Sequence, residues 1–306
     1  MKKKGFTLVE LLVVIAIIAL LMGILMPALA RVRQIAYRLY CGTNLSGIGK
    51  AMLIYCNDYD DEMPKAGGRN SVYAPSIANW RNVTRQAAFG LDAAGNGGAA
   101  NITSCFYLLI KYSEVTPKSF LCKGDSGATE FKPSDEGLTG VENIDLWDFG
   151  VPPTQAHCSY AYHMPYGVYA LTSSSEPGMA VAADPNPWLA TTGTTARPAT
   201  DWNIFKVITG ATRESIKKGN AQTHQEDGQN VLFMDGHSVF EKSSRSGVDD
   251  DNIFTRWVGA GATADKRNGT YAVVVVGVQP ADRNDSFLVT DNVGGGGTTT
   301  TTGATR

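Results

Sequence analysis

Glu10 is the one charged residue in a long apolar run, and its surroundings limit the chemistry it can do. The run extends from Phe6 to Ala30. A carboxylate near hydrocarbon costs a few kcal/mol unless it is paired or lies near the membrane interface. An amine at a nearby chain terminus would neutralise Glu10 within one chain or between two chains. A structural alternative is a capping box, because Thr7-x-x-Glu10 has the spacing of a helix N-terminus.

Other side chains could bind a metal ion. His224 precedes Glu226 and Asp227, but a lone histidine in a polar turn is more often exposed to solvent than a ligand. Oxygen ligands that calcium accepts gather where a helix is expected to end: Asp58, Asp60, Asp61 and Glu62. That cluster lacks the spaced loop of an EF-hand. A solvated acidic helix end is therefore the favoured interpretation, and calcium is the alternative.

Composition and missing motifs exclude several classes of protein. The chain has 306 residues and a formal net charge of −2. No basic run interleaved with aromatic residues favours a nucleic-acid partner. The sequence has no P-loop, dinucleotide fingerprint, nucleophile elbow or HExxH motif, so we expect no catalytic residues and no enzyme activity. Five cysteines permit disulfides in an exported head, but their spacing does not give the pairing: Cys41, Cys56, Cys105, Cys122 and Cys158.

The apolar run is long enough to span a membrane. As a helix, Phe6–Ala30 would extend about 37 Å at roughly 1.5 Å per residue, against a bilayer core of about 30 Å. The lysines at 2–4 would stay in the cytoplasm and place the rest of the chain outside. A secretory signal peptide has a shorter apolar region, of about 7–15 residues. A plain membrane anchor has the right length but leaves Glu10 unexplained.

The N-terminus resembles a known class of leader. The segment from Gly5 to Leu12 reads GFTLVELL, and Pro27 lies in the apolar run that follows. This pattern resembles the leader of type IV prepilins and type II secretion pseudopilins. The resemblance implies that a prepilin peptidase cuts between Gly5 and Phe6 and methylates the new amine of Phe6. It also implies that Glu10 guides assembly with other pilin or pseudopilin subunits and an inner-membrane assembly platform.

The helix is expected to continue beyond the membrane as an amphipathic rod. Apolar residues fall within an arc of about 100° at 3.6 residues per turn: Tyr37, Cys41, Leu45, Ile48, Met52, Tyr55, Cys56 and Tyr59. This stripe predicts contact with a globular head, and the acidic residues before Pro64 predict that the helix ends near Tyr59. Gly42, Gly47 and Gly49 each weaken a helix by up to about 1 kcal/mol, so we interpret them as sites of close packing.

A second resemblance concerns the C-terminal half. Residues 41–55 with the acidic run after them, and the segment 224–237 (HQEDGQNVLFMDGH), are similar to a subgroup of pseudopilin-like proteins with a processing-associated H-X9-DG domain. The implied motif residues are His224, Asp235 and Gly236. Ten residues rather than nine separate His224 from Asp235. One extra residue in the turn at 226–228 would explain this, but the difference puts a defined role for His224 in doubt.

The strongest local signal in the head is a β-hairpin at 229–241. Val231–Met234 and His237–Phe240 flank Asp235-Gly236, which suits a two-residue type I′ turn. That turn would pair Met234 with His237, and it accounts for Asp235 and Gly236 without chemistry. Other predicted elements are a short helix at 104–112, strands at 120–122, 159–162 and 179–182, and a strand pair at 271–278 and 286–290.

Together these features predict an α+β, pilin-like fold, in which a long N-terminal transmembrane and amphipathic helix packs on a β-rich head with large loop insertions. The expected parts are a leader at 1–5, a transmembrane half-helix at 6–30, an amphipathic half-helix at 31–62, an extracytoplasmic head at 63–290 and a disordered Gly/Thr tail at 291–306. Within the head, 224–236 is the H-x10-DG segment.

The predicted function is a structural subunit of a type II secretion pseudopilus or a type IV pilus-like filament. One span would hold the chain in the inner membrane, with the head in the periplasm. The alternative is a membrane-anchored or filament-tip binding module for polysaccharide or exported cargo. Exposed tryptophans lining a cleft would favour that alternative, although ordinary core aromatics are the favoured interpretation: Trp80, Trp147, Trp188 and Trp202.

Overall fold

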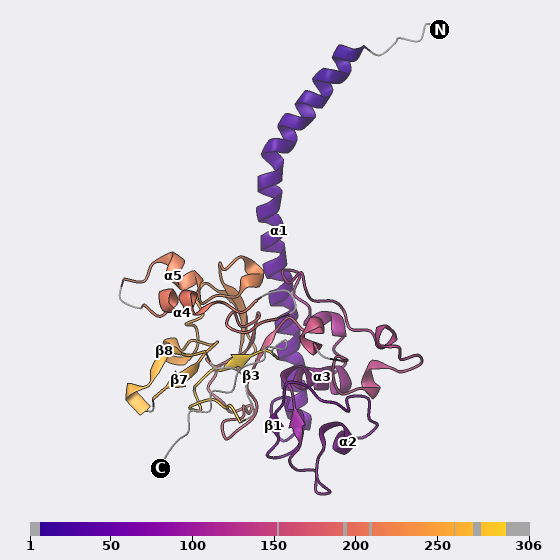
Figure 1. Cartoon of the computed structure of the whole chain (residues 1–306), viewed down its shortest axis with the longest axis vertical. Helices are drawn as coiled ribbons and strands as arrows, with labels where there is room; N and C mark the ends of the chain where they lie inside the picture. Colours follow the sequence, from indigo (N-terminus) through magenta and orange to yellow (C-terminus); the bar gives the residue numbers. More distant parts are fainter. Residues whose placement is uncertain are drawn as a thin grey trace.

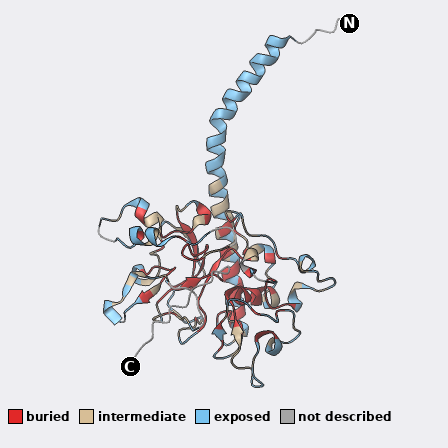
Figure 2. Ribbon diagram, viewed as in Figure 1, coloured by how far each residue is buried: buried red, intermediate tan, exposed pale blue. Residues whose placement is uncertain are grey.

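A single long helix carries the head of the molecule. In the computed structural model, α1 extends from Leu8 to Asp58 (51 residues) and projects from the head as a stalk (Figure 1). Its free half is exposed, and its C-terminal half is embedded in the head (Figure 2). By length and composition α1 can cross a membrane, and none of its apolar window is buried. The structure describes residues 7–151, 153–191, 195–207, 210–259, 261–271 and 277–291.

The buried face of α1 is the apolar stripe expected from the sequence. Cys41, Leu45, Ile48, Met52, Tyr55 and Cys56 are buried, whereas Tyr37 and Tyr59 lie at the margins and are half-buried. The helix ends at Asp58, next to the expected end near Tyr59 but short of position 62, the bound expected for the amphipathic half-helix, because the chain turns at 59–61. Pro27 lies inside α1 without ending it. Because proline lacks the N–H that would bond to the preceding turn, it accounts for the bend of the free half (Figure 1).

A five-stranded antiparallel sheet forms the centre of the head. Its order is β6 (Ser238–Glu241), β5 (Gln229–Phe233), β4 (Ala180–Ala183), β3 (Ala161–His163) and β9 (Leu288–Val289). Every residue of β3, β4, β5 and β9 is buried, whereas β6 is a partly exposed edge strand. The embedded half of α1 packs against β5 and β6. The α+β, pilin-like fold is therefore confirmed.

The hairpin formed by β5 and β6 exists, but its predicted turn and register are wrong. Val231 pairs with Val239 and Leu232 with Ser238, one residue out of step with the type I′ prediction. The backbone N–H of Phe233 donates to the carbonyl of His237 at 3.0 Å, so three residues form the loop. Gly236 alone has positive φ, at 86°. The turn therefore resembles the three-residue loop with a glycine bulge. A one-residue shift exchanges the two faces of a strand, which explains why Val239 is 39% exposed.

Short elements complete the head, and one strand prediction was wrong. The predicted helix at 104–112 is α3, but 120–122 is not a strand, because the chain forms a 3₁₀ turn at Pro117–Phe120. Residues 286–290 contain β9, which pairs with β3. Most of the other strand predicted for this pair, residues 272–276, lies outside the described residues. The remaining elements are α2 (Arg85–Phe89), α3 (Ile102–Tyr112), α4 (Ala199–Phe205), α5 (Arg213–Lys217), the parallel pair β1 (Val72–Tyr73) and β2 (Ala99–Ala100), and the antiparallel pair β7 (Arg256–Val258) and β8 (Asp265–Thr270).

Two glycines let α1 approach β5 closely. A Cβ atom at Gly49 would lie 2.6 Å from Cδ1 of Leu232, and a Cβ atom at Gly42 would lie 3.0 Å from Oδ1 of Asn230. Gly47 is exposed, and no described residue lies within 4 Å of its Cβ position. The interpretation of these glycines as close-packing sites is therefore confirmed for Gly42 and Gly49 and wrong for Gly47.

We expect alanine at these two helix positions to have opposite effects. Gly47→Ala should raise the free energy of unfolding by up to about 1 kcal/mol, because alanine favours the helix. Gly49→Ala should lower it by about 1–2 kcal/mol, because Leu232 is buried and must move. Denaturant unfolding of the full chain in detergent measures both changes. Equal shifts for the two variants would contradict the close approach at Gly49.

The N-terminus of α3 is held by two buried carboxylates. Asp291 accepts hydrogen bonds from the backbone N–H groups of Ile102 and Thr103, at 3.0 and 2.8 Å. Asn101, the N-cap of α3, donates to Asp148 at 2.6 Å. The sequence placed Asp291 in a disordered tail; it is instead 1% exposed and part of the head. The rest of that expected tail, from 292 onwards, lies outside the described residues.

These carboxylates should make the stability of the head depend on pH. Burial raises the pKa of Asp148 from 3.8 to about 7, and it raises the pKa of Asp291 to about 6. Between pH 3.8 and about pH 7 the folded state therefore holds a proton at Asp148 that the unfolded chain has lost. Folding stability falls with rising pH over that interval, at about 1.4 kcal/mol per unit of pKa shift.

We expect Asp148→Asn to flatten this decline, because the variant has no proton to lose at position 148. The measurement is the slope of the free energy of unfolding between about pH 4 and pH 7, the interval between the unfolded and folded pKa values of Asp148. The exposed carboxylate Asp135, changed to Asn, is the matched control and should leave the slope unchanged. An unchanged slope in Asp148→Asn would contradict the raised pKa.

Candidate functional site

The start of α1 forms the first candidate site. Thr7 is the N-cap, and its backbone N–H and hydroxyl donate to Oε2 of Glu10 at 2.8 and 2.7 Å. In return, the backbone N–H of Glu10 donates to Oγ1 of Thr7 at 3.3 Å. The expected capping box is therefore present. Gly5 and Phe6, the predicted cleavage and methylation residues, lie outside the described residues.

Glu10 stands within an exposed apolar surface. Its neighbours Leu8, Val9 and Leu11 are 78%, 68% and 54% exposed. No lysine or arginine among the described residues forms an ion pair with Glu10, and its second oxygen, Oε1, accepts no hydrogen bond from them. The capping box therefore uses one oxygen, and the negative charge has no counter-ion within residues 7–151 or the other described segments. An arriving cation would find the other oxygen available.

A second candidate site surrounds His224, which the sequence placed in an exposed polar turn. That expectation was wrong, because His224 is only 4% exposed. Its Nε2 atom lies 3.1 Å from Oδ2 of Asp184 and 3.5 Å from Sγ of Cys122. Cys122 forms a disulfide with Cys41 of α1. The predicted neighbours Glu226 and Asp227 do not join the cluster, and the ligand-type atoms come instead from Cys41, Cys122, Asp184 and His224.

Four segments far apart in the sequence build this cluster. Cys41 lies on α1, Cys122 follows the 3₁₀ turn at 117–120, Asp184 follows β4, and His224 ends the 3₁₀ turn at 222–224. Asn230 on β5 fixes the carboxylate, since its backbone N–H donates to Oδ2 of Asp184 at 2.6 Å. No spacing rule links these positions. The only sequence signals were the cysteine at 41 and the histidine at 224.

The turn after His224 is tied to α1 by charge. Asp227 accepts a hydrogen bond from Arg38 at 2.6 Å and lies 3.2 Å from Nζ of Lys217. The hydrogen bonds from Arg38 and Lys217 hold the pKa of Asp227 below its ordinary value. Next to it, Glu226 pairs with the buried guanidinium of Arg197 at 3.0 Å. This turn therefore works as a joint between the helix and the head.

The other half of the H-x10-DG segment has a structural role. Asp235 and Gly236 form the exposed loop of the hairpin, and the side chain of Asp235 accepts the backbone N–H of His237 at 3.0 Å. That hydrogen bond contributes most to keeping the pKa of Asp235 below its ordinary value. His224 contacts Asp184, whereas the histidine in contact with Asp235 is His237. The two ends of the motif therefore do not form a common site. The interpretation of Asp235 and Gly236 as turn residues is thus confirmed.

The acidic residues at the end of α1 are exposed, as a solvated helix end requires. In the described part of the chain, the cluster at His224 is the one group of three or more His, Cys, Asp or Glu side chains that converge. Asp58, Asp60, Asp61 and Glu62 therefore offer no preformed calcium site.

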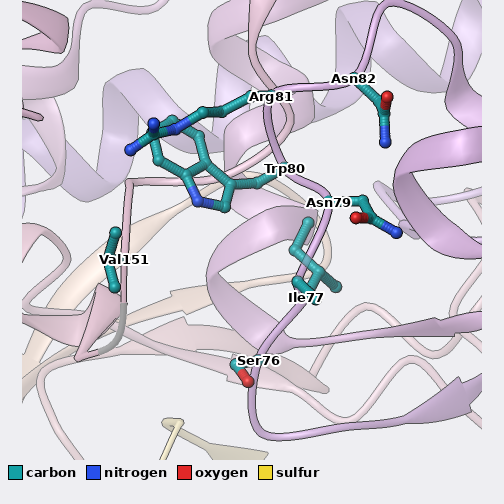
Figure 3. A pocket seen from close by; sticks show the side chains of 8 residues that line it. Ser76, Ile77, Asn79, Trp80, Arg81, Asn82 and Val151 are labelled. Carbon is teal, nitrogen blue, oxygen red and sulfur yellow. The ribbon is translucent and has the colours of Figure 1, made fainter. Parts of the chain in front are cut away.

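The tryptophans do not form an exposed aromatic cleft. Trp80, Trp147 and Trp188 are 4%, 3% and 4% exposed, and Trp202 is half-buried against Trp188 at 5.0 Å between ring centroids. A hollow of about 520 Å³ opens beside Trp80 (Figure 3). There the guanidinium of Arg81 lies over the indole, 4.4 Å from its centroid, and covers the face that a sugar would stack on. The interpretation of these residues as core aromatics is confirmed.

Comparison with known proteins gives one match, at the N-terminus. Residues 1–26 match the family model described as the prokaryotic N-terminal methylation motif. The match includes Gly5, Phe6 and Glu10. No curated protein and no solved structure matches the chain.

His224, in the H-x10-DG segment, and His237, directly after it, should respond differently to substitution. His224→Ala leaves the buried Asp184 carboxylate without its imidazole partner and opens a cavity, so we expect a loss of about 3 kcal/mol in the free energy of unfolding. His237→Ala, at an exposed loop, should change it by less than about 1 kcal/mol. Denaturant unfolding of the oxidised chain measures both, and similar losses would contradict the assignment of His224 to the buried joint.

Proposed function

We propose that this chain is a structural subunit of a type II secretion pseudopilus or a type IV pilus-like filament. The observation that carries the proposal is the methylation motif at residues 1–26, placed on a helix that can cross a membrane. The motif supports a type IV pilin-like prepilin, its processing by a prepilin peptidase and its assembly with other pilins. The chain is then a substrate of that peptidase rather than a catalyst.

The first step is anchoring in the inner membrane. The lysines at 2–4 stay in the cytoplasm, α1 spans the bilayer once, and the head lies in the periplasm. Leader cleavage between Gly5 and Phe6 then creates a positive amine at Phe6. N-methylation leaves that amine protonated at neutral pH. A cation is thereby placed four residues from Glu10.

The second step is assembly on an inner-membrane platform. Once α1 leaves the bilayer, its apolar surface has to be covered by other helices, because a contiguous exposed apolar surface of this kind is unstable in water. Ile15, Leu20 and Ile24 are 57%, 67% and 69% exposed and belong to that surface. Side-by-side packing of α1 from several copies covers it. The head remains outside the bundle.

The third step sets the register between subunits. Glu10 satisfies one oxygen through the capping box and keeps a second oxygen for a neighbour's Phe6 amine. In a low-dielectric helix bundle that pairing is favoured, since each charge alone is costly. Helices that slide out of register lose the pair. The carboxylate of Glu10 thus caps the N-terminus of its own helix and aligns the neighbouring subunit.

Two variants distinguish the charge of Glu10 from its capping role. Glu10→Gln keeps a side chain that can accept the Thr7 hydrogen bonds but removes the charge. Thr7→Ala removes the cap hydroxyl but keeps the charge. We expect Glu10→Gln to reduce incorporation into filaments by at least about tenfold, and Thr7→Ala to reduce it far less, since a capping interaction contributes only about 1 kcal/mol. The measurement is the amount of each variant in sheared or periplasmic filament fractions.

The N-terminal mass of the protein from host membranes tests processing separately. A mature chain that begins at N-methylated Phe6 supports the proposal. An intact Met1 or Lys2 would leave a membrane-anchored protein without prepilin processing. A start at Arg31 would indicate an ordinary signal peptide and overturn the filament proposal.

A further inference from the structure

We propose that the cluster at His224 is a zinc site that forms when the Cys41–Cys122 disulfide is reduced. The ligands are the two cysteine thiolates, Nε2 of His224 and a carboxylate oxygen of Asp184. One ligand atom from each residue lies within 4.8 Å of the other three. All four residues are buried.

The distances suit a small tetrahedral ion. Zinc bonds of about 2.0–2.3 Å place neighbouring ligand atoms roughly 3.3–3.8 Å apart. Nε2 of His224 lies 3.5 Å from Sγ of Cys122 and 3.1 Å from Oδ2 of Asp184. After reduction, the two sulfur atoms have to separate to about 3.7 Å, a small movement for side chains with free rotation about χ1.

A second observation points to a missing partner. Asp184 is 0% exposed, and its Oδ1 atom has no hydrogen-bond partner among the described residues. A buried carboxylate oxygen is normally satisfied, so an unpartnered one calls for an explanation. Asn230 supports the other oxygen, with its side-chain amide 3.1 Å from Oδ2 of Asp184. The same amide nitrogen lies 3.3 Å from Nε2 of His224.

The ligand set selects zinc over calcium. Two thiolates and an imidazole are soft or borderline ligands, which suit zinc, whereas calcium takes oxygen ligands alone. The site also lies next to a cavity of about 400 Å³ where α1 leaves the head, and His224 is the one proposed ligand that lines this cavity. Gly124 lies at this edge, and a Cβ atom there would lie 3.2 Å from Nδ1 of His224.

The chemistry balances as follows. A phosphine and one water molecule reduce the disulfide, giving two thiols and a phosphine oxide. Zinc then displaces one proton from each thiol and binds the two thiolates with the imidazole and the carboxylate. The disulfide connects α1 to Cys122, just after the 3₁₀ turn at 117–120. The zinc ion would connect the same two segments and would add Asp184 after β4 and the turn at 222–224. The reduced chain with zinc therefore keeps the joint that the oxidised chain holds covalently.

The test uses the full-length chain in detergent, with zinc as the probe. Zinc is titrated against a chromophoric chelator, before and after reduction by a phosphine in oxygen-free buffer. We expect about one zinc ion per chain after reduction and none before, with a thermal midpoint that zinc raises in the reduced chain only. Equal binding in both states, or no binding after reduction, would overturn the site.

Matched variants assign the ligands. His224→Gln should weaken zinc binding by more than about tenfold, since even the loss of an outer-shell partner costs 10-fold or more. His237→Gln and Cys158→Ser should leave the affinity unchanged, the second because Cys158 is a buried thiol outside the cluster. If His224→Gln binds zinc as the natural chain does, the assignment fails.

Cobalt substitution keeps the test decisive if His224→Gln does not fold. Cobalt(II) added to the reduced natural chain should give thiolate charge-transfer bands and the intense visible bands of a four-coordinate ion. A spectrum with only the weak bands of a six-coordinate ion would overturn the proposal. The outcome is independent of filament assembly, because the spectrum is recorded on the isolated chain.

Discussion

The two halves of α1 bury their apolar side chains in different ways. The embedded half of α1 buries its apolar stripe against β5 and β6, so its position relative to the head is fixed by packing. The free half presents apolar side chains on every face, and no part of the head that the structure describes covers it. Only lipid or other apolar helices can cover it. The hydrophobic effect therefore favours a membrane, or contact with other apolar helices, as the surroundings of this half.

The joint between stalk and head has to be stronger than packing alone would make it, because the head meets α1 only along its second half. Gly42 and Gly49 bring the helix backbone close to β5. The disulfide from Cys41 ties the helix to Cys122, and the ion pair from Arg38 ties it to Asp227 in the turn after His224. Covalent, ionic and van der Waals contacts thus converge on about three turns of one helix.

The predictable parts of the structure are those in which neighbours in sequence decide the outcome. The 3.6-residue periodicity predicted the buried stripe of α1, and the spacing of Thr7 and Glu10 predicted the capping box. The hairpin at 229–241 was located correctly, but its register depended on whether Asp235-Gly236 adopted a two- or three-residue loop, which the local sequence does not distinguish. His224 was misjudged because its partners Cys122 and Asp184 come from distant segments. The polar residues around His224 indicated an exposed turn, and only the fold shows that the buried carboxylate of Asp184 lies beside it.

A rigid joint determines how such a subunit would respond to force along the stalk. Since the contacts of Cys41, Arg38 and Gly49 all lie on one continuous helix, axial movement of α1 carries the head with it as one body. Flexibility then has to come from the free half, where Pro27 removes one backbone hydrogen bond. In the proposed filament, this arrangement would let neighbouring stalks adjust their packing without loosening their heads. The free half of α1 would then adjust the packing, and the embedded half would transmit force to the head.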